Sequence, residues 1–457
     1  MDCVPMPVGE LFELVNESID AGRLDRAERL LGHVLAVAPN AADALHLRGL
    51  IAYRRKDAHE AAALMERGVA AGGRRGGQLR NLSEVYRYMG RLDDALATAR
   101  RAIVAEPADP LGPFNLAMVH YDRVELEPCI AAALHAVQLR PGLPQAHMKL
   151  AQAYLMAGDF PRGWEHYEWR YRIPGAAPLM PPTERRQWDG GETAGRLLLI
   201  ADQGFGDVVM FARYVAWARG RAPDIMIACS AEMAALLARM FPGVPLFTRW
   251  DVVPEYLAYC AFSGLPRLHG TTLESIPVEA PYLAPDPARV ASWAERLDAL
   301  LPAGPRRVGI AWAGRPSHNN DHSRSVGLHQ LGALAAVPGV VFVSLQKGEA
   351  AARVADWPGP APLVEFGPLL GDFEDTAAVI AQLDLVVAVD TAIVHLAGAM
   401  GVPAWVMLPY AADWRWLRAR ADSPWYPGMR LFRPPATRRW DAVTSDVAAA
   451  LSARFAA

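Results

Sequence analysis

A glycine-rich turn with an aspartate follows the first apolar run of the C-terminal part of the chain. The run RLLLIA begins at residue 196, and DQGFGD follows at residues 202–207. Gly204 and Gly206 would let the backbone approach a ligand closely, and Asp207 would stand at the start of the next helix. A carboxylate there can serve a function in the cleft or simply cap the helix. The pattern is neither GxGxxG nor a Walker loop, so both interpretations stay open.

Two basic side chains follow later apolar runs and are suited to binding phosphate. Arg324 lies in the polar loop RPSHNNDHSRS after RVGIAWAG, and Lys347 follows VVFVSLQ. An arginine can clamp a phosphate with two hydrogen bonds, or it can form a surface salt bridge. Lys347 could balance diphosphate charge, and Glu349 could accept hydrogen bonds from ribose hydroxyls. A purely structural role is the alternative for each of the two.

The same polar loop carries His318, Asp321 and His322, which are residue types that bind metal ions. A His-x-x-Asp-His spacing can supply metal ligands, but loops rich in Asn and Ser are more often turns. We therefore expect a turn here and no metal site.

A third group of polar residues follows the run DLVVAV. Asp390 and Thr391 are expected at a strand-to-helix turn, with His395 one helical turn beyond Thr391 on the same face. A helix N-terminus offers free N–H groups and the positive end of a dipole, which suits a diphosphate. An ordinary N-cap with a packed histidine is the alternative.

The elements that must position these residues alternate between short apolar runs and helical stretches from residue 196 onward. Such alternation predicts parallel sheets, here in two Rossmann-like halves. In open α/β sheets, ligands bind beyond the carboxyl ends of the strands. Asp207, Arg324, Lys347 and the turn at residues 390–391 all follow apolar runs. We therefore expect these residues to gather at one cleft.

The N-terminal third has a 34-residue period, which is the period of tetratricopeptide (TPR) repeats. Prolines that end helices and small residues that allow close helix packing both recur in this register: Pro39, Pro107 and Pro141, with Gly73 in the vacant slot, and Ala27, Ala61, Ala95 and Cys129. The period predicts helical hairpins stacked into a solenoid.

A fifth unit begins at Pro144 and becomes aromatic in GWEHYEWRYRIP. This change is typical of a capping repeat that packs against another part of the chain, although terminal repeats are commonly atypical in any case. We expect four regions: a TPR solenoid over residues 1–172, a linker rich in Pro and Gly over 173–195, and two Rossmann-like halves over 196–295 and 296–457.

Composition excludes several broad classes. The chain has 457 residues with a net charge of -3, so its bulk charge would not collect nucleic acid or anionic membrane. The four cysteines form no CxxC pair, which indicates neither a zinc knuckle nor a disulfide framework. We find no signal peptide and no apolar run long enough to span a bilayer, and we therefore expect a cytoplasmic protein.

Taken together, the chain resembles the bacterial TPR-containing glycosyltransferases, whose catalytic part is similar to the lipopolysaccharide heptosyltransferase family. The resemblance spans nearly the whole chain and is carried in order by LLLIADQGFGDVVMFARY, VGIAWAGRPSHNNDHSRS, VSLQKGE, LDLVVAVDTAIVHLAGAMGVPAWVMLP and DWRWLRARADSPWYPGMRLFR. It implies a GT-B fold, in which two Rossmann-like domains follow the α-helical solenoid and the C-terminal one holds most of the nucleotide-sugar. It also implies that no cofactor and no essential metal are needed.

The resemblance assigns roles residue by residue. Asp207 matches the aspartate proposed as general base on the acceptor hydroxyl. Arg324 lies in the loop where heptosyltransferases carry a phosphate-binding lysine, and Lys347 resembles the phosphate-contacting lysine of the more distant O-GlcNAc transferases. Glu349 lies where a ribose contact is expected. The relatives commonly have Glu-Gln-Gly where this chain has Asp202-Gln-Gly, which puts the role of Asp202 in doubt.

The remaining donor-site residues implied by the resemblance are Gly204, Gly206, Asp390, Thr391 and His395. Trp414 and Trp416 are candidates for packing beside the donor, although tryptophans more often fill cores. The final segment, DAVTSDVAAALSARFAA, is expected to form a closing helix.

Two classes of function remain open from the sequence. The leading one is a nucleotide-sugar-dependent glycosyltransferase whose repeats recruit a protein acceptor; similar TPR-linked transferases act on flagellins and other surface proteins. The alternative is a TPR scaffold with a catalytically silent GT-B part. A third interpretation keeps the enzyme but makes the acceptor a lipid-linked glycan.

Overall fold

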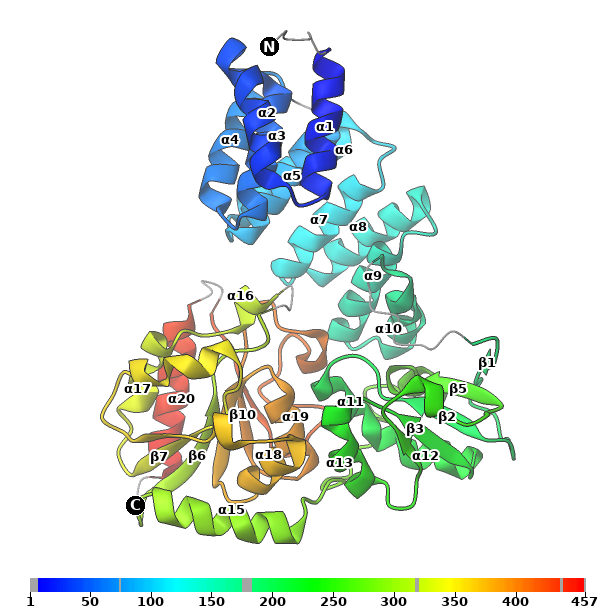
Figure 1. Cartoon of the computed structure of the whole chain (residues 1–457), viewed down its shortest axis with the longest axis vertical. Helices are drawn as coiled ribbons and strands as arrows, with labels where there is room; N and C mark the ends of the chain where they lie inside the picture. Colours follow the sequence, from blue (N-terminus) through cyan, green and yellow to red (C-terminus); the bar gives the residue numbers. More distant parts are fainter. Residues whose placement is uncertain (1–6, 74, 175–182, 317–319, 436–438, 456–457) are drawn as a thin grey trace. The chain divides into compact units, whose positions relative to one another are not determined.

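The fold is described from a computed structural model that covers residues 7–73, 75–174, 183–316, 320–435 and 439–455 (Figure 1). The chain divides into two compact units, Met1–Ala153 and Tyr154–Ala457. The first is helical, and the second contains two parallel β-sheets with their helices.

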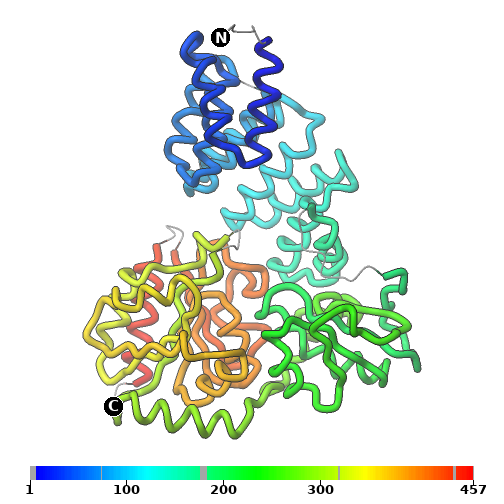
Figure 2. Tube along the Cα trace, in the orientation of Figure 1, coloured from blue at the N-terminus to red at the C-terminus, as the bar shows by residue number. Residues whose placement is uncertain are grey.

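Helical hairpins follow one another through the N-terminal part of the chain, and Figure 2 traces them. The helices are α1 (Val8–Asp20), α2 (Leu24–Val37), α3 (Ala42–Arg54), α4 (Ala58–Ala70), α5 (Gly76–Tyr88), α6 (Leu92–Ala105), α7 (Leu111–Asp122), α8 (Leu126–Leu139), α9 (Pro144–Ala157) and α10 (Phe160–Tyr167). The second helix of each hairpin begins 34 residues after the previous one, at residues 24, 58, 92, 126 and 160. The predicted period is therefore the period of the hairpins.

The small residues of the repeat lie where the two helices of a hairpin approach each other. Ala27, Ala61, Ala95 and Cys129 are all fully buried. Gly163 continues the series in α10, and a Cβ atom there would lie 2.6 Å from the Leu155 side chain. Larger side chains at these positions would push the helices apart.

The turn inside each hairpin contains one residue with left-handed backbone geometry. These residues recur with the repeat period as Gly22, Lys56, Gly90, Val124 and Gly158. Glycine adopts positive φ without steric cost, but Lys56 has φ 68° and the β-branched Val124 has φ 58°. Two of the five turns are therefore strained.

The helix α10 and the following 3-10 turn at Glu168–Arg172 belong to the second compact unit. The Trp164 indole donates to the Thr271 carbonyl (3.1 Å), and its ring lies edge-on to that of Phe211 with centroids 6.4 Å apart. The boundary between the compact units thus falls earlier than the boundary at residue 172 expected from sequence. The reason is that the aromatic residues of the fifth hairpin pack onto the α/β part.

The first sheet has five parallel strands in the order β1-β5-β2-β3-β4. They are β1 (Arg186–Gln187), β2 (Leu197–Ile200), β3 (Ile225–Ala228), β4 (Leu246–Phe247) and β5 (Ala258–Ala261), with helices α11 (Phe205–Phe211), α12 (Val215–Arg221), α13 (Ala231–Met240) and α14 (Leu265–His269). Residues 183–195 are not a free linker, because β1 pairs with β5 and Trp188 is buried against Trp217. Residues 175–182 of the expected linker lie outside the described residues.

The second sheet has six parallel strands in the order β11-β10-β9-β6-β7-β8. They are β6 (Arg306–Ala311), β7 (Val340–Ser344), β8 (Leu363–Glu365), β9 (Leu385–Val389), β10 (Ala404–Met407) and β11 (Arg430–Phe432), with helices α15 (Pro287–Leu300), α16 (Asp321–Arg324), α17 (Gly332–Ala335), α18 (Phe373–Ile380), α19 (Ala392–Ala399) and α20 (Trp440–Phe455). Strands β7 and β9 are buried along their whole length, as expected for a parallel sheet covered on both faces.

The helix α15 spans the boundary expected at residues 295–296 and packs on the second half of the α/β part. Arg289 is paired with Asp372 (2.7 Å) and Asp375 (2.9 Å), and the Trp293 indole donates to Asp375 (3.1 Å). The second half therefore includes α15 from its start at Pro287. The expected C-terminal helix is α20, and its Val443, Val447 and Leu451 contribute to the core of this half.

Within the described parts of the chain, we find no helix that is both long enough and apolar enough to cross a membrane.

Candidate functional site

The DQGFGD turn places Asp207 in the first turn of α11. Gly204 precedes the helix, and its backbone N–H donates to Oδ2 of Asp207 (3.0 Å). Gln203, within the same turn, has a φ of 68°, which is rare for a residue with a side chain. Such strained geometry is often found at functional sites. The hydrogen bond from the Gly204 N–H is the helix-capping contact of Asp207, and it involves one of the two carboxylate oxygen atoms.

The other oxygen of Asp207 is bound by an arginine from the opposite half of the α/β part. Arg415 donates to Oδ1 of Asp207, and it also donates to Oδ1 of Asp413 (2.6 Å). The Asp207 side chain is only 20% exposed. Burial raises the pKa of Asp207 above its usual value, while the positive charge of Arg415 opposes that rise. Asp207 is therefore a more basic carboxylate than an exposed one.

The strand-to-helix turn after β9 places Asp390 and Thr391 before α19, as expected. Burial and the nearby Asp413 raise the pKa of Asp390 to about 6. His395 is buried in α19, and its Nδ1 lies 2.9 Å from the Tyr426 hydroxyl. Burial, together with the charges of Arg415 and Arg213, lowers the pKa of His395 to about 3. The imidazole is therefore neutral at physiological pH and can offer a hydrogen bond without a charge.

One buried polar atom at this turn, Oγ1 of Thr391, has no hydrogen-bond partner among the described residues. The Trp416 indole stacks on His395 with ring centroids 5.4 Å apart, and its hydrogen bond to Asp390 opposes the rise in the pKa of that carboxyl group. Buried polar groups in folded proteins are nearly always paired, so the Thr391 hydroxyl is suited to binding a ligand. Trp416 is thus part of the core, and its indole N–H is engaged by Asp390.

Arg324 lies beside the same turn. It ends α16, and its guanidinium lies 3.4 Å from the Asp390 carbonyl oxygen and 3.4 Å from Oδ1 of Asp321. Both distances are long for hydrogen bonds to a guanidinium, so its donors are only weakly engaged. The Arg324 side chain is 17% exposed. It is therefore a partly buried cation with donors to spare.

Lys347 and Glu349 lie just beyond the end of β7, as expected, but their contacts are separate from those of Asp207, Asp390 and Arg324. The Lys347 ammonium donates to the Leu370 carbonyl, and Glu349 is exposed at the start of a 3-10 segment. The contacts that the structure describes do not join either residue to Asp207 or Asp390. The neighbouring Gln346 links the ends of β6 and β7 by accepting hydrogen bonds from the backbone of Trp312 and Ala313.

Close packing of two helices brings the two halves of the site together. A Cβ atom on Gly206 would lie 2.7 Å from Cδ2 of His395, so α11 can approach α19 only with glycine at this position. Asp207, Arg415, Asp390, Thr391, His395 and Arg324 are linked through these contacts; we call them the strand-end cluster. The cluster lies at the carboxyl ends of β2 and β9, where α/β folds bind ligands.

Sequence reasoning missed Arg415 and Asp413. The DWRW segment that contains them drew attention to its tryptophans, whereas the arginine between them makes the contact to Asp207. The sequence does show an arginine between two tryptophans, which is a sign that its charge could be buried. The partner of this arginine, Asp207, lies 208 residues away in sequence. Trp414 is buried against Trp164, with ring centroids 5.4 Å apart.

Asp202 is a structural anchor. It is fully buried and accepts hydrogen bonds from the Tyr171 hydroxyl (2.6 Å) and from the backbone N–H (3.0 Å) and hydroxyl of Ser263. Arg170 is also buried and donates to the Ser263 hydroxyl (2.9 Å). This network fastens the segment after α10 to the first sheet.

Within the described residues, no group of three or more His, Cys, Asp and Glu side chains is arranged to hold a metal ion. Asp321 accepts hydrogen bonds from the Ser325 hydroxyl (2.9 Å) and from Arg324, so it organises the turn of the polar loop. His318 lies outside the described residues.

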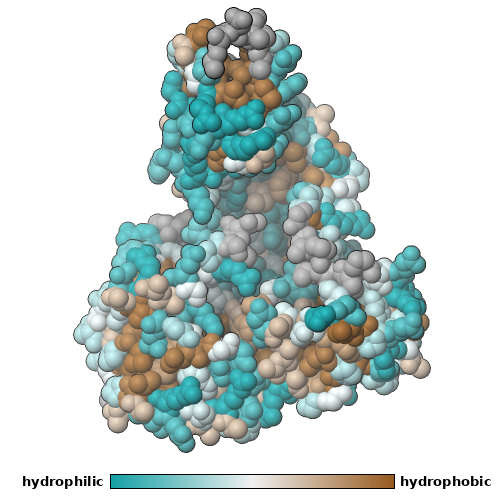
Figure 3. Space-filling model, in the orientation of Figure 1, coloured by the Kyte–Doolittle hydropathy of each residue, from teal (hydrophilic) through white to brown (hydrophobic). Residues whose placement is uncertain are grey.

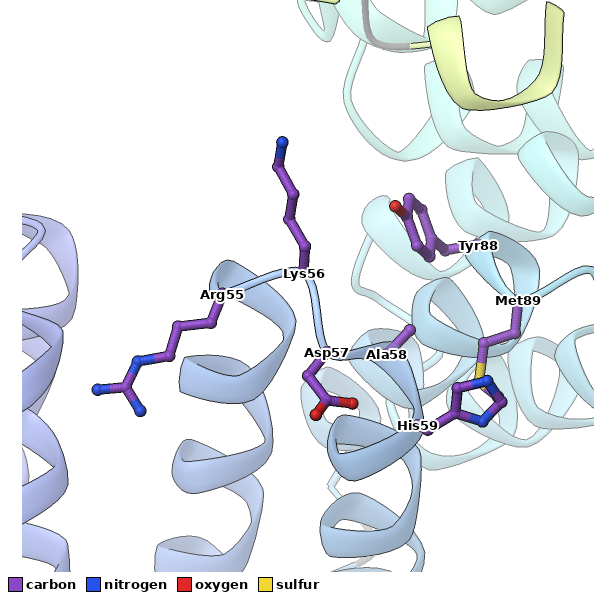
Figure 4. A pocket seen from close by; sticks show the side chains of 7 residues that line it. All are labelled: Arg55, Lys56, Asp57, Ala58, His59, Tyr88 and Met89. Atoms are coloured by element: carbon purple, nitrogen blue, oxygen red, sulfur yellow. The ribbon is translucent and has the colours of Figure 1, made fainter. Parts of the chain in front are cut away.

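The repeats carry a separate hollow of about 420 Å³ at the turn between α3 and α4. It is lined by Arg55, Lys56, Asp57, Ala58, His59, Tyr88 and Met89. Figure 4 shows the Arg55 side chain directed away from Lys56 and Tyr88, and this arginine is paired with Asp25 and Glu28. In the view of Figure 3 the surface of the repeats is mostly hydrophilic, with a hydrophobic patch near the N-terminal end.

Comparison with known proteins supports the repeat assignment. Residues 12–74 match a tetratricopeptide repeat family. The N-terminal solenoid is a TPR domain. Repeats of this kind build extended binding surfaces, which points to a protein partner.

The TPR-containing chain also has a curated relative, the protein FlbA of Caulobacter vibrioides. The two are 32% identical over 372 residues, which cover 74% of this chain and 60% of FlbA. The aligned length exceeds that of the repeats, so the similarity extends into the α/β part. The chain spans less than two thirds of the length of this relative.

Solved structures are similar to part of the chain. MamA from Desulfovibrio magneticus is 18% identical with a TM-score of 0.33, covering 36% of this chain and 97% of MamA. PilF from Pseudomonas aeruginosa is 15% identical with a TM-score of 0.37, covering 51% of this chain and 92% of PilF.

Proposed function

We propose that the chain is a glycosyltransferase that moves a sugar from a nucleotide-sugar to an acceptor hydroxyl, with the α/β part as a GT-B fold. One observation carries the proposal. A partly buried carboxylate with a raised pKa from one half meets, in the other half, a helix N-terminus whose threonine hydroxyl has no partner among the described residues and an arginine that is only weakly engaged. A base on one side and a phosphate seat on the other are what this reaction requires.

The donor diphosphate would bind at the start of α19. This helix has eight residues, and its free N–H groups and dipole favour an anion. Thr391 would donate its unpaired hydroxyl, and Arg324 would supply positive charge. His395 would add a neutral donor. Lys347 and Glu349 would contact the donor only if the ligand draws Lys347 away from the Leu370 carbonyl.

Asp207 would act on the acceptor. Its carboxylate takes the proton of the acceptor hydroxyl while the acceptor oxygen forms a bond to the anomeric carbon. The bond from that carbon to the diphosphate oxygen breaks, and the electron pair leaves with the nucleotide. Positive groups at the diphosphate stabilise the charge that develops on it. The reaction needs no redox partner.

The acceptor hydroxyl would belong to a protein recruited by the TPR domain. The repeats point to a protein partner. A TPR domain that binds the acceptor protein would raise the local concentration of this acceptor at the transferase to which the domain is fused. Flagellin or another surface protein is the acceptor class that the sequence resemblance suggests.

A TPR scaffold with a silent α/β part is the second candidate, and two contacts favour it. The carboxylate of Asp207 is already bound by Arg415, and Lys347 is already bound to a backbone carbonyl. A scaffold of this kind would bind partner proteins but no nucleotide.

Calorimetric titration with UDP, GDP, CDP, CMP and ADP separates the two candidates. We expect one nucleotide to bind to the wild-type protein and the Arg324→Ala variant to bind it at least tenfold more weakly, because a charged hydrogen bond is lost. Arg353→Ala is the matched control, since this arginine lies in the same half, is 66% exposed and pairs only with Asp356 in the described contacts. Absence of binding by every nucleotide at millimolar concentration would favour the scaffold.

A further inference from the structure

Arg415 fixes the Asp207 carboxylate from across the two halves. The guanidinium donates to Oδ1, while the Gly204 backbone N–H donates to Oδ2 at 3.0 Å. The Arg415 side chain is 11% exposed, and Asp413 holds it by a second contact of 2.6 Å. Both oxygens of the proposed base are therefore oriented, one by its own helix turn and one by Arg415.

The charge of Asp207 also depends on Arg415. Burial raises the pKa of Asp207, and Arg415 is the positive group that opposes it. The other charged or titratable groups facing Asp207 are Asp413, Asp202 and Tyr167, with the neutral His395 against Gly206. The two acids favour the protonated form of Asp207. Without Arg415, the partly buried carboxylate of Asp207 would be left beside two other carboxylates.

The loop that carries Arg415 is held from several sides. The Trp425 indole donates to the Arg415 carbonyl (3.0 Å), and Arg433 donates to the carbonyls of Trp416 (2.5 Å) and Leu417 (2.9 Å). Leu417 has a φ of 51°, so the loop is kept in a strained conformation by these contacts.

The same loop is packed against the end of the fifth hairpin. The ring of Trp414 lies edge-on to Trp164, with centroids 5.4 Å apart, and 6.0 Å from Tyr167. Phe160 of α10 stacks on Trp425 with centroids 5.8 Å apart. The aromatic side chains of α10 therefore contact Trp414, which adjoins Arg415, and Trp425, whose indole donates to the Arg415 carbonyl.

We propose that Arg415 is a positioning residue that orients Asp207 and keeps it ionised, and that α10 supports it through Trp414. The proposal rests on the function proposed above. It gives the aromatic fifth hairpin a task beyond capping the repeats, because a helix that follows the TPR domain directly would help to hold the base in place.

The pH dependence of sugar transfer tests the role of Arg415. In Arg415→Met we expect the acidic limb of the kcat profile to move up by at least one pH unit, with Arg415→Lys in between and nucleotide affinity within twofold of wild type. Arg420→Met is the control, because Arg420 pairs with Asp422 in the described contacts. An unmoved limb together with a parallel loss of nucleotide affinity would overturn the proposal and make Arg415 a donor-binding residue.

A stability cycle tests the pair independently of turnover. Asp207→Asn, Arg415→Met and the double variant are unfolded in the full chain by denaturant at pH 7.5. We expect a coupling of at least fivefold in the unfolding equilibrium constant. Additive effects would overturn the proposal. If the two substitutions are coupled but the protein binds no nucleotide, the interaction between Asp207 and Arg415 is confirmed, and the proposed glycosyltransferase function is contradicted instead.

The support from α10 is tested by Trp164→Phe. We expect this variant to shift the acidic limb in the same direction as Arg415→Lys, whereas Trp250→Phe, at a tryptophan that is 43% exposed, should leave it unchanged. A normal pH profile in a folded Trp164→Phe protein would overturn this part of the proposal.

Discussion

At the scale of single residues, the two carboxylates of the strand-end cluster and the neighbouring Asp413 lie close to Arg415. Asp207 and Asp413 both accept hydrogen bonds from Arg415, and the charge of Asp413 disfavours ionisation of the partly buried Asp390. An excess of buried negative charge is costly, and a diphosphate would add to it. The weakly engaged donors of Arg324 and the N–H groups at the start of α19 are therefore needed if an anion is to bind here. Protonation of Asp390 would also reduce the excess.

The raised pKa of Asp390 predicts a pH-dependent stability. Because its folded-state pKa is about 6, the folded state binds more protons than the unfolded state between about pH 4 and 6, and stability falls as pH rises through this range. Asp390→Asn removes the effect. Relative to wild type, we expect the variant to gain up to about 3 kcal/mol on going from pH 4 to pH 8.

Denaturant unfolding of both proteins at the two pH values measures the gain from Asp390→Asn. The difference between the proteins cancels the titration of all other groups that the substitution leaves undisturbed. A difference that does not change with pH would mean that Asp390 has an ordinary pKa.

At the scale of elements, the backbone geometry of the turns recurs in the repeats as regularly as the helices do. The left-handed turn residue occurs in all five hairpins, but Lys56 occupies a position where glycine is found in three of the others. Lys56 is exposed, so its side chain contributes little packing.

We expect replacement of Lys56 by glycine to increase the stability of the protein. Lys56→Gly should stabilise the TPR domain by about 1 kcal/mol, because glycine adopts positive φ without the cost borne by other residues. Thermal unfolding of the full chain is the measurement. Lys56→Ala keeps the strain and is the control; an equal gain in the two variants would show that the charge of Lys56, and not its backbone, is responsible.

Much of the element order was predictable from sequence, and the exceptions have physical reasons. The apolar runs at residues 197–200, 225–228, 340–344 and 385–389 are strands, and the 34-residue period of the hairpins follows from the spacing of small residues. The strand β1 was missed because two residues in a segment rich in Pro and Gly cannot display alternation. Arg415 was missed because its partner lies in the other half, so no local pattern records the contact.

At the scale of the whole molecule, the fifth hairpin belongs to the α/β part as much as to the repeats. Its α10 continues the repeat period, yet Phe160, Trp164 and Arg170 are buried within the second compact unit. By its sequence period α10 is a repeat helix, and by its packing it is part of the second compact unit.

Truncation tests this dual membership. A chain starting at residue 144 keeps the fifth hairpin and should unfold cooperatively. A chain starting at residue 175 loses the buried aromatic side chains of α10 and the network around Asp202, and should be less stable by several kcal/mol. Thermal unfolding of the two fragments gives the comparison. Equal unfolding temperatures would show that α10 is dispensable for the α/β part.

The most direct measurement is turnover of a nucleotide-sugar carrying whichever nucleotide binds, followed as release of that nucleotide with and without added cell-extract protein as acceptor. We predict release by the wild-type protein, stimulation by the added protein, and a loss of at least about 100-fold in Asp207→Asn with nucleotide affinity retained. Release that is unaffected by Asp207→Asn would contradict the assignment of the base. No release from a folded protein with any nucleotide-sugar would contradict the glycosyltransferase itself.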